Sequence, residues 1–309
     1  MKLEQVYRIG FDKLGSPLVK EATDLFDRTF AEDVRSEYTL AERLRISRAL
    51  SNTLIGLKLA RAGALPEASN TLADVRSSLT GSGKGCRELI ESFLLAVDAF
   101  IEYQRGHWQN ASDRLNAAEQ VDIALRERLP ILGSHLVQLQ HNRMRIMLGC
   151  GSVEEAASMA FGLIEYLSGT SKSQPRDSFP LPDEIPRTIR AGLIAQVTQD
   201  VATIAYTASN KKLIRALSSI RLNCELSPCL QLNSWRNVIS SPPAPGTLNQ
   251  FLAEGRQAIP ALWYDAVARA IDTANGSEIK PLVLELSADI EKWIDAPKLY
   301  VRKLKEAAT

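Results

Sequence analysis

One layout of glycine, alanine and apolar residues occurs three times between residues 60 and 163, and it restricts the fold of this chain more than any other feature. The three stretches read ARAGALPEASNTLADV, YQRGHWQNASDRLNAA and LGCGSVEEAASMAFGL. They align on Gly63, Gly106 and Gly151. Small or apolar residues follow each glycine at the same distances: two residues later (Leu65, Trp108, Val153), five later (Ala68, Ala111, Ala156), nine later (Leu72, Leu115, Ala160) and twelve later (Val75, Ala118, Leu163). Such repetition predicts one supersecondary unit used three times.

Each of these positions has a physical reason to recur in a helical hairpin. A glycine after a helix adopts the left-handed conformation that lets the chain turn back tightly. The apolar residue two positions later covers the turn, and the alanine five positions later lets the two helices approach closely. The next two positions continue the same apolar face of the second helix at i+4 and i+7. We therefore predict pairs of antiparallel helices, and no alternating run of β-branched residues indicates a strand.

This layout resembles the second half of the tetratricopeptide-repeat consensus, in which a turn glycine and an aromatic or apolar residue precede Ala…Leu…Ala on the second helix. Small residues also stand seven positions before the turn at Gly56 and Ala99, where the third copy has Met144. The copies are 43 and 45 residues apart, whereas the family period is 34. The early tryptophan of the first helix and the closing proline are missing. The resemblance implies an all-α, tetratricopeptide-like α-α superhelix of antiparallel helix pairs.

Helix-capping residues and a proline- and serine-rich stretch divide the chain into four predicted regions. Residues 1–38 form N-terminal helices, one of which starts at Ser16-Pro17 and runs to about Glu32. A capping box, Thr39-Leu-Ala-Glu42, opens the repeat region 39–168. The proline- and serine-rich residues 169–186 read as a linker. Residues 187–309 form a C-terminal helical region of degenerate repeats or a cap, with helices expected at 189–208, 211–222, 260–275, 278–293 and 297–307.

Composition indicates a soluble, cytoplasmic protein. The 37 Lys and Arg residues nearly balance the 36 Asp and Glu residues, which argues against a general nucleic-acid binder. Four cysteines are few for a chain of 309 residues, and they suggest reduced thiols instead of a disulfide framework. The N-terminus has no apolar signal segment, and no stretch is apolar enough to span a membrane.

No motif predicts a metal, a cofactor or a catalytic centre. His107 lies in a repeat turn, while His135 and His141 fall on different faces of one helix and cannot share a metal ion. Cys224 and Cys229 have no second pair of ligands beside them. The GSGKG stretch at 81–85 lacks the spacing of a phosphate-binding loop and follows no strand. We expect no cofactor and no enzymatic activity.

One polar stripe is the candidate binding site. Gln138, His141, Asn142 and Arg145 stand at i, i+3, i+4 and i+7 on the first helix of the third unit. In the tetratricopeptide family first helices line a concave groove that receives peptides, which implies that Phe93 and Tyr103, on the first helix of the preceding unit, lie near the same groove. The alternative reading is an ordinary solvated helix face. The lysine and asparagine pattern with which some members of the family grip a terminal carboxylate is absent.

The sequence thus predicts a non-enzymatic scaffold or adaptor that mediates protein–protein interaction by binding a protein or peptide in the groove of a helical array. Two alternatives remain open at this point. The first is a regulator that senses a ligand or peptide, and the second is an all-helical enzyme with an unrecognised site.

Overall fold

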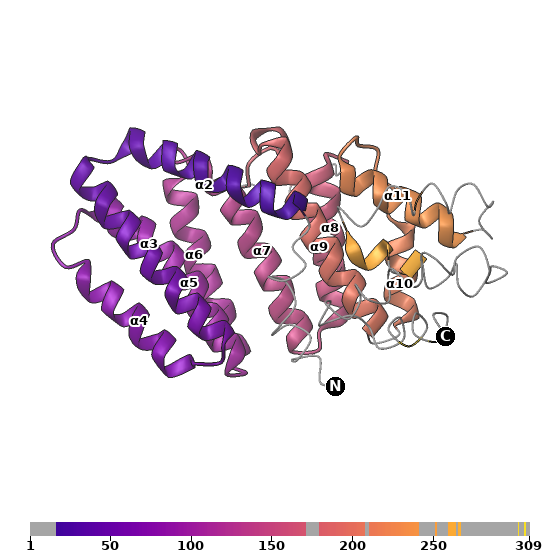
Figure 1. Cartoon of the computed structure of the whole chain (residues 1–309), viewed down its shortest axis with the longest axis horizontal. Helices are drawn as coiled ribbons and strands as arrows, with labels where there is room; N and C mark the ends of the chain where they lie inside the picture. The colour runs from indigo at the N-terminus through magenta and orange to yellow at the C-terminus, as the bar shows by residue number, and fades with distance from the viewer. Residues whose placement is uncertain are drawn as a thin grey trace. The chain divides into compact units, whose positions relative to one another are not determined.

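The computed structural model describes residues 17–170, 179–207 and 210–240, together with positions 251, 259–263, 265, 266, 302 and 306. Within these ranges the chain is helical and contains no strand, which confirms the all-α prediction (Figure 1). The elements are α2 (Pro17–Glu37), α3 (Leu40–Arg61), α4 (Leu65–Ser78), α5 (Lys84–Gln104), α6 (Trp108–Leu125), α7 (Leu132–Gly149), α8 (Val153–Ser168), a 3-10 turn η1 (Pro182–Glu184), α9 (Arg187–Thr207), α10 (Lys211–Ser219) and α11 (Ser227–Ser240).

Several helices begin where their capping residues predict. Helix α2 starts at Pro17 and ends five residues beyond the predicted Glu32. The capping box before α3 is formed, because the Thr39 hydroxyl accepts from the Glu42 amide while the Glu42 carboxylate accepts from the Thr39 amide. Asn210 caps α10 by accepting from the Leu213 amide at 3.1 Å. Helix α11 was not predicted. The helices expected after residue 260 lie largely outside the described residues.

The three predicted turns share one backbone geometry. Gly63, Gly106 and Gly151 all have positive φ angles, of 84°, 81° and 90°. In each turn the amide of the following residue donates to the carbonyl five positions back: Ala64 to Leu59, His107 to Glu102 and Ser152 to Met147, at 2.9–3.0 Å. This 6→1 bond is the Schellman motif that closes a helix at a left-handed residue. The predicted left-handed conformation of the three turn glycines is therefore confirmed.

The predicted apolar face of each second helix is also buried. The residues five, nine and twelve positions after the turn glycines are each at most 2% exposed: Ala68, Leu72, Val75, Ala111, Leu115, Ala118, Ala156, Ala160 and Leu163. Close approach is plain at Gly56 of α3, where an added Cβ would meet Leu72 Cδ2 at 2.8 Å. Small residues thus allow α3 and α4 to pack tightly.

We expect replacement of Ala68 or Ala111 by leucine to lower the free energy of unfolding by about 1–3 kcal/mol, because each overpacks a full helix contact. The matched controls are Ala73→Leu and Ala117→Leu, which change exposed alanines of α4 and α6 and should shift stability by less than about 0.5 kcal/mol. Urea denaturation followed by circular dichroism measures both. Equal stability of the buried and exposed variants would show that these alanines do not pack against a neighbouring helix.

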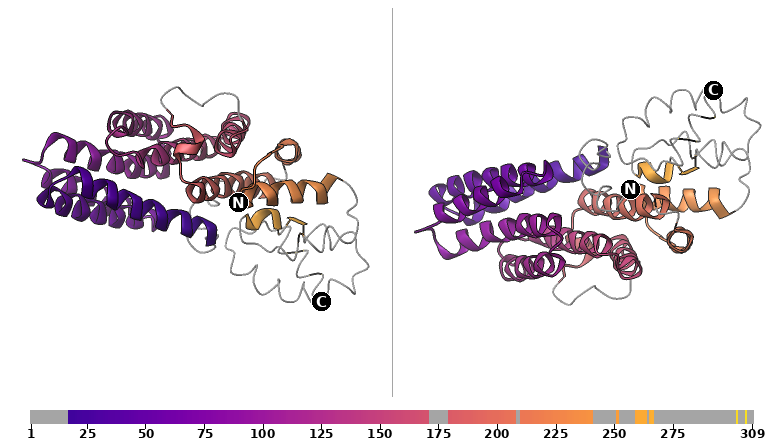
Figure 2. Two further views of the ribbon diagram at one scale, coloured as in Figure 1. Left: turned by 90° about the horizontal axis from the view of Figure 1, so that it is seen from above. Right: turned by 90° about the horizontal axis from the view of Figure 1, so that it is seen from below.

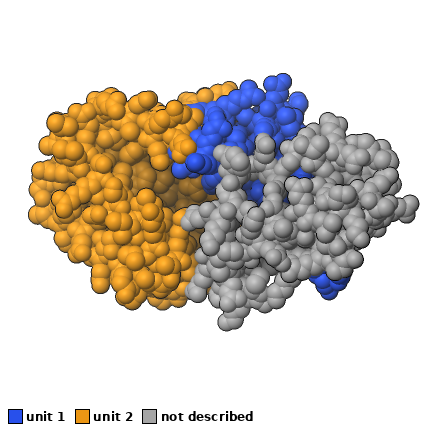
Figure 3. All heavy atoms as spheres, in the orientation of Figure 1, with its two compact units in different colours: residues 1–23, 157–175, 186–309 blue, residues 24–156, 176–185 orange. Residues whose placement is uncertain are grey.

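The chain divides into two compact units, which Figure 3 distinguishes by colour. One consists of residues 24–156 and 176–185, and the other of residues 1–23, 157–175 and 186–309. In the first unit α3 packs against α4 and α5, α5 against α6, and α6 against α7. These helices lie alongside one another in the further views of Figure 2. Their core contains Ile46, Leu72, Leu89, Ile90, Leu94 and Leu129, all at most 1% exposed.

The other unit contains α9, which packs against α10 and α11. An added Cβ on Gly192 of α9 would lie 2.3 Å from the Cβ of Ala22, so this contact depends on glycine. Two glutamines accept hydrogen bonds from residues 259–261: Gln231 from the Ile259 amide at 2.7 Å and Gln199 from the Ala261 amide at 2.9 Å. The buried Trp235 indole donates to Asp265 at 2.8 Å. Polar side chains of α9 and α11 therefore satisfy the backbone of this stretch.

Candidate protein-binding site

The predicted polar stripe lies on α7 and is more buried than a solvated helix face. Gln138, Asn142 and Arg145 are half-buried, and His141 is fully buried. The Gln138 amide donates to Asn142 Oδ1 at 3.3 Å and lies 3.2 Å from His141 Nδ1, and Arg145 donates to Asn142 Oδ1 at 3.4 Å. His141 is thus part of the interior in this structure. The other three side chains remain partly accessible.

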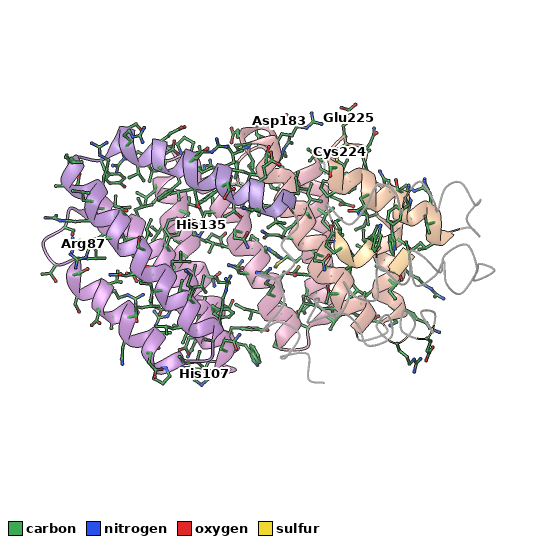
Figure 4. All side chains as sticks on the ribbon, in the orientation of Figure 1. Arg87, His107, His135, Asp183, Cys224 and Glu225 are labelled. Carbon is green, nitrogen blue, oxygen red and sulfur yellow. The ribbon has the colours of Figure 1, made fainter. Side chains whose placement is uncertain are left out.

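Phe93 of α5 lies at one end of this face of α7. Its ring stacks on His135 with centroids 4.5 Å apart, and Phe30 of α2 meets it edge-on at 5.4 Å. Figure 4 labels His135 among the helices of this unit. Phe93 is therefore half-covered by the chain's own aromatic side chains.

Tyr103 of α5 lies at the other end. It is buried, packs edge-on against Trp108 with centroids 5.3 Å apart, and covers Gly149, where an added Cβ would meet its ring at 2.5 Å. His135 and Gly149 are fourteen residues apart on α7, so both fall on the face that carries Gln138 and Asn142. The structure accordingly places the two predicted aromatics at opposite ends of the stripe, and their role in binding stays a prediction.

The structure also contains a buried polar cluster that sequence reasoning missed. Asp122 of α6, which is fully buried, accepts hydrogen bonds from Ser92 of α5 at 2.5 Å and from His135 Nδ1 at 2.7 Å. Three helices are thereby joined at one carboxylate. The sequence contains a weak indication that Asp122 is buried. Asp122 stands four residues after the core residue Ala118 and must lie on the same face of α6.

A second buried carboxylate, Glu119, follows the core residue Leu115 by the same spacing. Its Oε2 accepts from Arg143 Nη2 at 3.0 Å and from the Gln140 amide at 3.1 Å. Arg143 also donates to Gln140 at 3.1 Å and to Asn116. The ion pair is enclosed, with Glu119 fully buried and Arg143 7% exposed. Such a pair needs hydrogen bonds to compensate both buried charges. Both Nη groups of Arg143 donate here, whereas its buried Nε has no hydrogen-bond partner.

Neither cluster has the geometry of a nucleophilic catalyst. In a serine triad the hydroxyl donates to histidine, which a carboxylate orients from the other side. Here the Ser92 hydroxyl donates to the Asp122 carboxylate, and His135 contacts that carboxylate instead of the hydroxyl. His107, the third histidine, is exposed and lies with its Nδ1 2.8 Å from Glu102. No group of three or more potential metal ligands occurs among the described residues.

The four cysteines are free thiols that differ in environment. Burial raises the pKa of Cys86. Burial also raises the pKa of Cys229, and a hydrogen bond with Cys224 adds to that shift. Cys150 is exposed. Since the thiolate is the reactive form, a raised pKa and burial both slow the reaction of a cysteine with an alkylating reagent.

We expect iodoacetamide at pH 7.5 to alkylate Cys150 at least about tenfold faster than Cys86 or Cys229 in the folded protein. Peptide mass spectrometry after timed quenching measures the three rates. In urea the rates should converge, because unfolding removes the burial that separates them. Rapid labelling of Cys229 in the native protein would contradict its buried position.

None of the helices in the described part of the chain is long and apolar enough to cross a bilayer. Comparisons with protein-family models, with curated proteins and with solved structures find no match for this chain.

Proposed function

We propose that this protein is a non-enzymatic scaffold or adaptor that binds a segment of another protein on its helical array. The observation that carries the proposal is the repetition itself. The three turn glycines share one backbone conformation, and the alanine five residues after each of them is buried. Stacked hairpins of this kind form an extended surface with little preorganised chemistry, and such surfaces serve recognition.

The stripe on α7 supports a location for binding. Asn142 and Arg145 are half-buried and lie in the unit that holds Phe93 and Tyr103. Aromatic and arginine side chains are enriched among the residues that anchor protein interfaces. A partner segment that lies along α7 would meet amide and guanidinium donors between two aromatic ends.

An adaptor is favoured over an enzyme by the state of the buried polar groups. Asp122 and Glu119 each accept two hydrogen bonds from the chain's own side chains. A catalytic carboxylate has to exchange protons with a substrate in a cleft. These two groups instead join α5, α6 and α7.

Comparison of the Asn142→Ala/Arg145→Ala double variant with the unaltered protein tests the proposal. Both are used as bait in a native lysate, and bound proteins are quantified by mass spectrometry. We expect at least one protein to be retained by the unaltered bait and reduced about fivefold or more by the variant, since a loss of 1 kcal/mol in affinity corresponds to that ratio. A thermal melt checks that the variant is folded.

The matched control is Asn70→Ala/Arg114→Ala, which removes the same residue types from exposed positions of α4 and α6. It should retain the same proteins as the unaltered bait. An identical set of bound proteins with all three baits would reject the α7 stripe as the binding site.

A further inference from the structure

Helix α3 carries apolar residues on two opposite faces. One face is buried and contains Ile46, Ala49, Thr53, Gly56 and Ala60. On the other face Leu40 and Leu44 are each 65% exposed, and Leu54 and Ile55 are each 50% exposed. A helix that covers a core on one side ordinarily has a polar outer face. The outer face of α3 departs from that rule.

The four exposed residues form one continuous strip with smaller side chains between them. At about 3.6 residues per turn, Leu40, Leu44, Ser51 and Ile55 fall on the same side of α3, and Leu54 lies beside them. The strip extends to Lys58, so it spans about 27 Å at a rise of about 1.5 Å per residue. We call residues 40, 44, 47, 48, 51, 54, 55 and 58 the α3 strip.

The second helix of the same hairpin provides the contrast. The exposed positions of α4 between Glu67 and Ser78 carry Glu67, Asn70, Ala73, Asp74, Ser77 and Ser78, with no large aliphatic residue. Both helices belong to one hairpin and pack on each other. Among the described residues of this unit, the exposed large hydrophobic side chains lie on α3, apart from Leu181. Large exposed aliphatic groups at this spacing are typical of a surface that binds a partner.

The charges on the α3 strip have one sign. Arg48 and Lys58 lie on it, and exposed Arg45 and Arg61 lie close to its edges. The strip contains no carboxylate, and the one acid of α3, Glu42, is bound to Thr39 in the capping box. A complementary partner therefore presents leucine-type side chains flanked by carboxylates.

We propose that the α3 strip is a docking surface for an acidic amphipathic helix of another protein. This inference rests on the proposed adaptor function and adds to it a second surface and the chemistry of its partner. A helix laid along α3 would place aliphatic side chains at i, i+4, i+7 and i+11 against Leu40, Leu44, Leu54 and Ile55. Its flanking glutamates would meet Arg45, Arg48 and Lys58.

Charge and composition favour an acidic helix over two other occupants of the α3 strip, a second copy of the chain and a membrane surface. A second copy of the chain would bring cationic strips together, and like charges across an interface oppose association. A membrane surface is usually bound by a face of continuous apolar residues that includes aromatics. The α3 strip has serines at 47 and 51 and no aromatic residue, and α3 is already held in place by its buried face.

The test uses two synthetic fluorescent peptides of the same composition. One has leucines at i, i+4, i+7 and i+11 with glutamates on either side, and the other has the same residues in an order that scatters the leucines around the helix. We expect the full-length protein to bind the first peptide at micromolar concentration and the second at least tenfold more weakly. Binding of the first should weaken steeply with added salt.

Variants then locate the peptide. Leu44→Gln/Leu54→Gln and Arg48→Glu/Lys58→Glu should each weaken binding at least tenfold, whereas Asn70→Gln/Ala73→Gln on α4 should leave it unchanged. These sites are exposed, so the variants are expected to fold, and circular dichroism verifies this. Equal affinity of the leucine variant and the unaltered protein, or equal binding of the two peptides, would overturn the proposal.

Two further measurements test the other occupants of the α3 strip, a second copy of the chain and a membrane surface. Concentration-dependent dimerisation in sedimentation experiments that Leu44→Gln/Leu54→Gln abolishes would replace the proposal by a second copy of the chain. Binding to phosphatidylserine vesicles that the same variant abolishes, without peptide binding, would replace it by a membrane surface. The Asn142→Ala/Arg145→Ala variant should bind the peptide normally. If that variant also keeps its lysate partners while the peptide still binds α3, the α7 site fails and the α3 surface stands.

Discussion

Replacing Arg143 by methionine is expected to lower the free energy of unfolding by about 3–5 kcal/mol, because it leaves the carboxylate of Glu119 buried without its cation. Glu119 would keep the Gln140 amide as a donor, but one neutral hydrogen bond does not compensate a buried charge. Asn116 and Gln140 would each lose a bond to the guanidinium as well. Urea denaturation compared with the unaltered protein measures the loss.

A double variant makes this prediction specific to the ion pair. Glu119→Leu/Arg143→Met removes both charges and fills the site with apolar groups, so its stability should return to within about 1–2 kcal/mol of the unaltered protein. The control Arg114→Met removes an exposed arginine of α6 and should cost less than about 0.5 kcal/mol. A double variant as unstable as Arg143→Met alone would mean that Arg143 acts through packing and not through its charge.

The turns and the apolar face of each hairpin could be predicted from sequence because their causes are local. Gly63, with its φ of 84°, illustrates this. Its left-handed conformation depends on its own lack of a side chain. The sequence spacing from Gly63 to Ala68 and Leu72 follows from helix geometry alone. The capping box at Thr39 and Glu42 is equally local. Features determined by residues within one or two helical turns are accessible to pattern reasoning.

The burial of α7 could not be predicted in this way. Its polar residues resemble those of a solvated helix, but Gln140, His141 and Arg143 are buried. Their burial depends on neighbours distant in sequence, such as Glu119, which lies 24 residues before Arg143. A charged side chain is buried only when a partner is supplied, and the spacing within α7 carries no information about that partner.

Helix α11 was not predicted, although its sequence contains a signal for the start of a helix. Pro228 is the second residue of α11, Pro17 is the first residue of α2, and proline is favoured in the first turn of a helix. Two buried side chains of α11, Gln231 and Trp235, bond to residues beyond 258. Those contacts are tertiary and were not accessible from sequence.

Replacement of Asp122 by alanine is expected to cost about 2–5 kcal/mol in unfolding free energy. The Ser92 hydroxyl and the His135 ring would both lose their acceptor inside the first unit, and each unsatisfied buried group costs about 1–3 kcal/mol. The control Asp113→Ala removes an exposed carboxylate of α6 that accepts one hydrogen bond from Gln109. It should cost less than about 0.5 kcal/mol.

The two donors of Asp122 can be separated by a double-mutant cycle. Ser92→Ala removes one of them, so the further loss from Asp122→Ala should be smaller in the Ser92→Ala background than in the unaltered protein. The difference reports the coupling between α5 and α6, while the loss that remains reports the bond between Asp122 and His135 on α7. Additive effects of the two substitutions would contradict a direct Ser92–Asp122 bond. A cost of Asp122→Ala no larger than that of Asp113→Ala would contradict the buried cluster as a whole, because three helices could then not depend on this carboxylate.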